Sequence, residues 1–202
     1  MIALTHAWWV AMIRGIAAIA IALIVLLQSQ SHVSMTMVTA ALGAYILVDG
    51  IVALAGGVAL GLGLGLCGLL LLAEGLVGVT VAAVSLSDIR AAPHNIHVAE
   101  IPIIAWAGMM GIAEVYIGFQ FGRALPANRL TTHRSALPPE RACLLVGVIA
   151  IAFAISLLVL PMTSAGIAVP VIALFAAALG YLRIRSGLAL GSLHLDHFYS
   201  PS

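Results

Sequence analysis

The sequence predicts an all-α integral membrane protein with six transmembrane helices, arranged as three repeated helical hairpins in a single membrane domain (1–202). Hydrophobic residues make up 63% of the 202 positions and charged residues only 7%, whereas a typical soluble domain carries about 25% charged residues. The chain also contains six apolar runs of about 20 residues, the length that a helix needs to cross a bilayer. The net charge of +1 gives no reason to expect a nucleic-acid partner.

Polar or proline-containing segments separate most of the apolar runs. The link between the second and third runs, residues 56–65, has no charged residue, so a tight glycine-rich turn is expected there. The first run is longer than the apolar part of a typical signal peptide, so it is expected to remain as a helix. The predicted spans are 8–27, 35–56, 64–86, 101–122, 142–160 and 164–182. They define hairpin repeats at about 8–56, 64–122 and 142–182 and a cytoplasmic tail at 183–202.

The arginines outside the spans predict the orientation of the chain. With six helices, both termini and the loops after the second and fourth helices share one side of the membrane. That side holds Arg123, Arg129, Arg134, Arg141, Arg183 and Arg185, and the other side holds Arg90. Because cytoplasmic loops are enriched in basic residues, both termini are expected in the cytoplasm. The compartment expected is the bacterial inner membrane, with the lipid bilayer as the first partner.

Glycines with a spacing of four residues predict close helix packing. One set is Gly57, Gly61 and Gly65, and the other is Gly118 and Gly122. Small residues at this spacing lie on one helix face and allow two backbones to approach closely in lipid. The faces could pack within the chain, or they could associate with a second copy or another membrane protein. Two cysteines, Cys67 and Cys143, are expected to be small packing residues.

Four ionisable residues fall inside the predicted spans, namely Arg14, Asp49, Glu74 and Glu114. A charge at this depth costs at least about 2.5 kcal/mol, so each needs a partner or a water-filled cavity. At about 1.5 Å of rise per residue, all four lie about 9 to 15 Å from the cytoplasmic ends of their helices. A bidentate pair between Arg14 and Asp49 is expected, with at least one carboxyl protonated near neutral pH. The layer is either a structural network or a site that binds protons or ions.

Similar segments recur in the three predicted hairpins. Three dipeptides, Arg14-Gly15, Glu74-Gly75 and Val146-Gly147, take matching places in the odd-numbered helices. In the even-numbered helices, Asp49 and Glu114 are expected to match, with leucine or glycine at that place in the third hairpin. The chain therefore looks like a tandem of three hairpins whose last member has lost its charges.

The chain resembles the HdeD-like family of small bacterial membrane proteins, and its first hairpin matches best. The resemblance rests on Trp8-x5-Arg14-Gly15-Ile16, on the segment Gly43-x-Tyr45-x-Leu47-x-Asp49-Gly50-Ile51 and on the triple hairpin. It covers about residues 8–190, and the second hairpin departs from it most. It implies a six-helix inner-membrane protein with a role in acid resistance, and it brings no catalytic residues with it.

The predicted external loop at 87–100 contains His94 and His97. This loop could be a solvated turn, a pH sensor or half of a metal site. Two histidines without a third ligand are weak evidence for a metal site. No metal or other cofactor is expected.

No serine has a paired base and no phosphate-binding loop is present, so enzyme activity is not expected. Three functions remain: a non-catalytic stress-response or assembly protein that packs against itself or a partner, a proton-responsive or transport protein, and an accessory subunit of a larger membrane complex.

Overall fold

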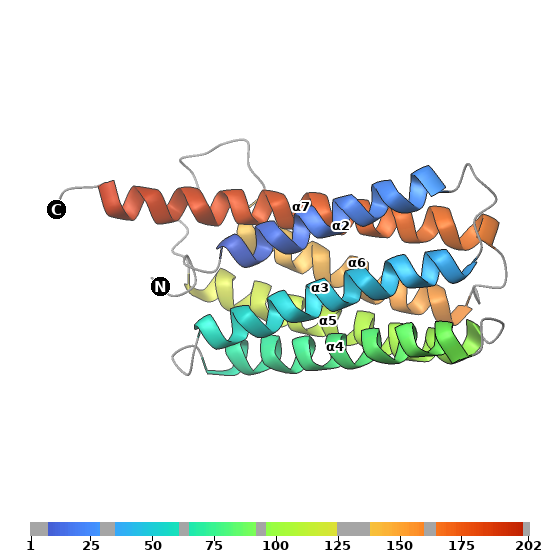
Figure 1. Ribbon diagram of the computed structural model, residues 1–202. Coiled ribbons are helices and arrows are strands. Elements are labelled where there is room, and N and C mark those ends of the chain that lie inside the picture. Colours follow the sequence, from blue (N-terminus) through green and yellow to red (C-terminus); the bar gives the residue numbers. More distant parts are fainter. Residues whose placement is uncertain are drawn as a thin grey trace.

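The computed structural model describes residues 8–28, 35–60, 65–91, 96–124, 138–159 and 165–199. These residues form six long helices (Figure 1), and no strand occurs among them. Each helix contains a segment of 20 to 23 residues that is long and apolar enough to cross a membrane. The helices are α2 (Trp8–Gln28), α3 (Met35–Leu60), α4 (Leu66–Ala91), α5 (Ile96–Ala124), α6 (Pro139–Val159) and α7 (Ala165–Tyr199). The predicted all-α fold with six membrane-spanning helices is confirmed.

The outer surface of the bundle is apolar, as a lipid-facing surface must be. Large side chains such as Leu27, Ile101 and Leu174 are more than 70% exposed. In water such a surface would aggregate, whereas in hydrocarbon it costs nothing and the helices satisfy their own backbone hydrogen bonds. The arrangement defines a multi-pass membrane protein.

Two helices continue beyond the apolar runs that predicted them. The segment 87–100 was expected as a loop, but α4 extends to Ala91 and α5 begins at Ile96. The prediction was wrong for most of this segment because a helix ends where its backbone hydrogen bonds end, which need not coincide with a change in hydropathy. His94 lies outside the described residues, and His97 lies in the first turn of α5.

Residues 183–199 of the predicted tail are the second half of a helix. α7 runs from Ala165 to Tyr199 and extends past the other helices at one end of the bundle (Figure 1). Arg183, Ser186 and Leu190 are buried within the bundle. The prediction was wrong because two arginines interrupt the apolar run at this point, and hydropathy reads a paired, buried arginine as a surface residue.

The six helices form a closed ring in which each helix packs on its two neighbours in sequence and α2 closes on α7. α2, α4 and α6 run in one direction, and α3, α5 and α7 run in the other (Figure 1). The most extensive packing joins α3 to α4, α5 to α6 and α2 to α7. The predicted hairpins, such as α2 with α3, contact one another less. We call the end at which α2, α4 and α6 begin the amino end of the bundle.

Reciprocal glycines explain which helices pack most closely. At each of the three tight crossings, a Cβ added to either glycine would lie 2.7–3.0 Å from the carbonyl oxygen of the other. Only glycine allows two helix backbones to approach this closely. The three pairs are Gly15 with Gly180, Gly50 with Gly75, and Gly111 with Gly147.

A second glycine follows seven residues later on α3, α5 and α7. Gly57 faces Leu72, Gly118 faces Leu144 and Gly187 faces Met12, with closest approaches of 2.6–2.9 Å for an added Cβ. The three crossings are therefore built alike, with an approximate threefold repetition around the ring.

The predicted glycine stripes correspond only partly to this pattern. Gly65 lies in a turn before α4 with a φ of 54°, a conformation that favours glycine, and it does not lie on a helix face. Gly61 lies outside the described residues. On the second stripe, Gly118 packs tightly, whereas an added Cβ at Gly122 would make only ordinary contacts with Glu140. The spacing of four was misleading because the true repeat has seven residues.

Buried apolar side chains form two clusters. The larger fills the middle of the bundle and the half away from the amino end, and it includes stacked rings of Phe153 and Phe175 with centroids 3.8 Å apart. The smaller lies near the amino end and includes Leu71, Phe121 and Leu190. The buried charged residues lie between the two clusters.

The glycine crossings predict the effect of alanine substitutions. In Gly75→Ala, the new Cβ would lie 2.7 Å from backbone atoms of α3, so the helices must separate and stability should fall by about 1–3 kcal/mol. Gly108→Ala is the matched control because an added Cβ there would meet no described atom of another helix within 4 Å. This control should be neutral, or more stable by about 0.5–1 kcal/mol through helix preference. Unfolding of both variants in mixed micelles measures the difference, and equal stabilities would contradict the role of the crossing.

Candidate functional site

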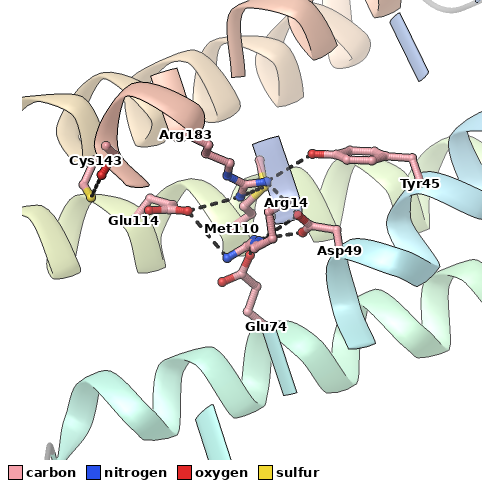
Figure 2. Close-up of polar contacts among 9 residues, drawn as sticks. Arg14, Tyr45, Asp49, Glu74, Met110, Glu114, Cys143 and Arg183 are labelled. Atoms are coloured by element: carbon pink, nitrogen blue, oxygen red, sulfur yellow. Dashed lines mark hydrogen bonds and ion pairs between the residues drawn. The ribbon is translucent and has the colours of Figure 1, made fainter. Parts of the chain in front are cut away.

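The four ionisable residues predicted inside the spans meet at the centre of the bundle, and a fifth joins them. Arg14 comes from α2, Asp49 from α3, Glu74 from α4 and Glu114 from α5 (Figure 2). The additional member, Arg183, comes from α7. None of the five is more than 8% exposed. We call these five residues the ionic network.

Arg14 contacts all three carboxylates of the network. Its Nε and Nη2 donate to the two oxygens of Asp49 at 2.7 and 2.8 Å, which confirms the expected bidentate pair. Nη2 also donates to Glu74 Oε1, and Nη1 lies 3.6 Å from Glu114 Oε1. A planar guanidinium with five donors can hold several acceptors at once, which a lysine could not do in the same geometry.

Arg183, on the helix that packs beside α2, contacts two of the same acids. Its Nη1 donates to Asp49 Oδ1 at 2.6 Å and to the hydroxyl of Tyr45 at 3.1 Å. Its Nη2 donates to Glu114 Oε1 at 3.1 Å and contacts the sulfur of Met110 at 3.2 Å (Figure 2). Asp49 and Glu114 are therefore each held between two guanidinium groups. Asp49 accepts charge-assisted hydrogen bonds from both arginines, whereas Glu114 accepts one from Arg183 and has Arg14 nearby, and these contacts fix the geometry of the network.

The glycine crossings bring these side chains together. Arg14, Asp49 and Glu74 each directly precede a crossing glycine, and Glu114 and Arg183 each follow one by three residues, close to one turn of helix. As a result, the α2–α7 pair carries two positive charges and the α3–α4 pair carries two negative charges. The α5–α6 pair carries Glu114. Within the ionic network, each ion pair joins one helix pair to another.

The ionic network has one more carboxylate than guanidinium groups. With all five groups ionised its net charge is −1, and no other described side chain of opposite charge contacts it. A single uncompensated charge in this environment is costly. Glu74 Oε2 is buried and has no hydrogen-bond partner among the described residues. The network is therefore suited to bind one proton, and Glu74 has the free oxygen atom that would accept it.

Sequence reasoning missed Arg183 because it was assigned to the tail. The seven-residue glycine spacing could have revealed it. Aligning Gly50, Gly111 and Gly180 places Ala53, Glu114 and Arg183 at equivalent positions. The same alignment corrects the expected match between Asp49 and Glu114: the equivalents of Asp49 are Met110 and Leu179. The third repeat has therefore kept a charge, on its second helix.

A cavity of about 80 Å³ lies on the amino-end side of the network. Arg14, Glu114 and Arg183 line it together with ten further residues. The lining residues come from the first turns of α2, α4 and α6 and from the later turns of α5 and α7. The ionic network thus has a cavity on one side and the larger apolar cluster on the other.

Both cysteines are buried and free, and both line the cavity. Cys143 Sγ lies 4.0 Å from Ser186 Oγ, whereas Cys67 belongs to the smaller apolar cluster. Within the described residues, histidine, cysteine and acidic side chains form no group that could hold a metal ion. The side chains of His94 and His97 lie outside the described residues.

No protein-family model, curated protein or solved structure matches this chain. The geometry of the ionic network and of the cavity is therefore the basis for a functional proposal.

Removal of Arg183 should destabilise the protein strongly. Arg183→Met keeps the length of the side chain but leaves three carboxylates with one guanidinium, and breaking such a buried pair costs about 3–5 kcal/mol. Arg123→Gln, an exposed arginine in the last turn of α5, is the control and should change stability by less than about 1 kcal/mol. Unfolding in mixed micelles at neutral pH provides the measurement. Similar losses in the two variants would show that Arg183 contributes no more than a surface charge.

Proposed function

We propose that the protein is a non-catalytic, proton-responsive protein of the bacterial inner membrane, with the ionic network as its proton-binding element. The single observation that carries the proposal is the excess of one carboxylate in a fully buried cluster. The resemblance to the HdeD-like family supports the same direction, because it implies a role in acid stress. A network that becomes neutral on binding a proton would respond to the pH on the side from which protons enter.

The association hypothesis loses its main support. It was motivated by glycine faces, but Gly57 and Gly118 pack against Leu72 and Leu144 of the same chain. These faces are therefore occupied within the ring. The hypothesis of an accessory subunit depends on partners for the lipid-facing helices, and no specific observation supports it. We therefore assign the function to the charged centre of the bundle.

Proton binding should be visible in the infrared spectrum. At neutral pH the purified protein should show the carbonyl stretch of a buried, protonated carboxyl group, because a proton removes the net charge of the network. Glu74→Gln should abolish this band. Glu140 is the other carboxylate among the described residues with a buried oxygen that has no hydrogen-bond partner, and it lies in the first turn of α6, outside the network. Glu140→Gln should leave the band unchanged. If the wild-type spectrum contains only ionised carboxylates down to about pH 5, below which ordinary acids begin to protonate, the proposal is wrong.

We also infer that both termini lie in the cytoplasm. The support is the distribution of arginines, which remains one-sided without Arg183. The last turn of α5, the first turn of α6 and the sequence between them contain four others, Arg123, Arg129, Arg134 and Arg141. The opposite side has Arg90. Trp8 begins α2 at the amino end, where an aromatic ring suits the membrane interface.

The orientation can be tested with fusions at the carboxyl terminus of the full chain. A fluorescent protein that matures only in the cytoplasm should be fluorescent, and alkaline phosphatase, which is active only in the periplasm, should be inactive. Fusion of the same reporters after residue 32, between α2 and α3, should give the opposite pair of results. Active phosphatase at the carboxyl terminus would reverse the inferred topology.

A further inference from the structure

The cavity next to the ionic network has the construction of a ligand site. Its walls are apolar side chains: Val10, Leu71, Ile117, Phe121, Val146 and Leu190. Its polar groups are concentrated on Arg14, Glu114 and Arg183, with Ser186 and Cys143 beside them. A mostly apolar wall with a few convergent polar groups is typical of sites for small molecules.

The polar floor of the cavity is able to bind a further group. Arg183 Nε is buried and has no hydrogen-bond partner among the described residues. Arg14 Nη1 lies 3.6 Å from Glu114 Oε1, which is longer than a hydrogen bond. Glu114 is the most exposed member of the ionic network, at 8%. The floor therefore offers guanidinium donors and one carboxylate acceptor that the protein itself does not fully use.

We propose that this cavity binds a short aliphatic monocarboxylic acid together with its proton. The proposal deepens the proton-binding role given above and rests on it. The acid carbonyl would accept from the guanidinium groups of Arg14 or Arg183, and the acid O–H would donate to Glu114. The alkyl chain would lie among the apolar side chains toward the amino end.

Charge selects this class of ligand in two ways. The two guanidinium groups and one carboxylate at the floor carry a local charge of +1, which disfavours a cation and favours a carboxylate. Asp49 and Glu74 lie behind them, so that the whole ionic network carries −1 when ionised. A carboxylate anion would therefore raise the buried negative charge unless it brought a proton with it, and a proton shared with Glu114 meets both requirements.

The volume limits the length of the chain. A cavity of about 80 Å³ is about half the size of a cavity of ~150 Å³ that holds benzene. The ligand should therefore have fewer non-hydrogen atoms than benzene, as acetic and propionic acids do. Longer acids would collide with the apolar walls near Phe121 and Leu190.

The first experiment measures thermal unfolding of the purified wild-type protein in detergent, at constant ionic strength, with added propionate. Propionate should stabilise the protein, and its apparent affinity should fall about tenfold for each pH unit above about 6, because the undissociated fraction of an acid that titrates near pH ~4–5 falls by that factor. Methyl acetate, ethylammonium and hexanoate are the comparison compounds and should not stabilise it. Methyl acetate has the same number of non-hydrogen atoms as propionic acid and keeps the carbonyl, but it has no proton to donate to Glu114. Equal stabilisation by methyl acetate, equal stabilisation by hexanoate or an affinity independent of pH would each overturn the proposal.

A cavity-filling variant locates the site. Ser186→Leu places a larger apolar side chain in the cavity without altering a charged residue and should abolish the effect of propionate. Thr80→Leu also introduces a leucine in place of a hydroxyl side chain, but on the exposed face of α4, and it should retain the effect. If Ser186→Leu does not fold, the four compounds tested on the wild-type protein still decide the matter.

The two proposals can fail separately. The infrared band of the protonated carboxyl is measured without propionate, so its loss in Glu74→Gln tests proton binding alone. A normal band together with no response to propionate would reject the ligand and leave the proton-binding role intact.

Discussion

The arrangement of the whole bundle depends on attraction between helix pairs of opposite charge. Glycine contacts assemble three tight pairs, and two of these pairs carry like charges, with Arg14 and Arg183 on one and Asp49 and Glu74 on the other. Helices in lipid gain no hydrophobic energy from associating, so packing and polar contacts must join the pairs. The ionic network supplies these contacts at the centre of the ring, where α2 and α7 meet the acids of α3, α4 and α5. Removing one member would therefore loosen the ring as a whole.

The charges also make an approximately threefold scaffold functionally asymmetric. The three crossings have the same glycine spacing, and each of α3, α5 and α7 carries an aromatic residue five positions before its first glycine: Tyr45, Trp106 and Phe175. The repeats differ at two nearby positions. The residue before the first glycine is Asp49, Met110 or Leu179, and the residue three positions after it is Ala53, Glu114 or Arg183. Tyr45 and Trp106 pack edge to face with centroids 5.8 Å apart, and the tyrosine hydroxyl accepts from Arg183. The network consequently faces a cavity on one side and closely packed side chains on the other, as a site with access from one side requires.

Some features could be predicted because they depend on local composition. The six spans follow from the length of the apolar runs, and the burial of Arg14, Asp49, Glu74 and Glu114 follows from their place within those runs. The pairing of the helices could not be obtained in the same way. The predicted hairpins join α2 to α3, α4 to α5 and α6 to α7, but the most extensive packing joins α3 to α4, α5 to α6 and α2 to α7, at the other end of the chain. This pairing depends on Gly15 meeting Gly180, a contact between residues far apart in sequence that no local pattern specifies.

The sequence by itself determined that the chain is a bundle of six membrane-spanning helices with buried charges, because the cost of placing polar groups in hydrocarbon leaves few alternatives. The tertiary structure alone decided which charges meet and how they balance. Arg183 looked like the start of a surface tail, and only its position beside Asp49 and Glu114 makes it part of the network. That change, from one arginine among three acids to two, sets the net charge at −1 and hence the capacity for one proton. The physical reason is that a residue's charge is given by its type, whereas the free energy of that charge depends on partners that only the folded chain brings within reach.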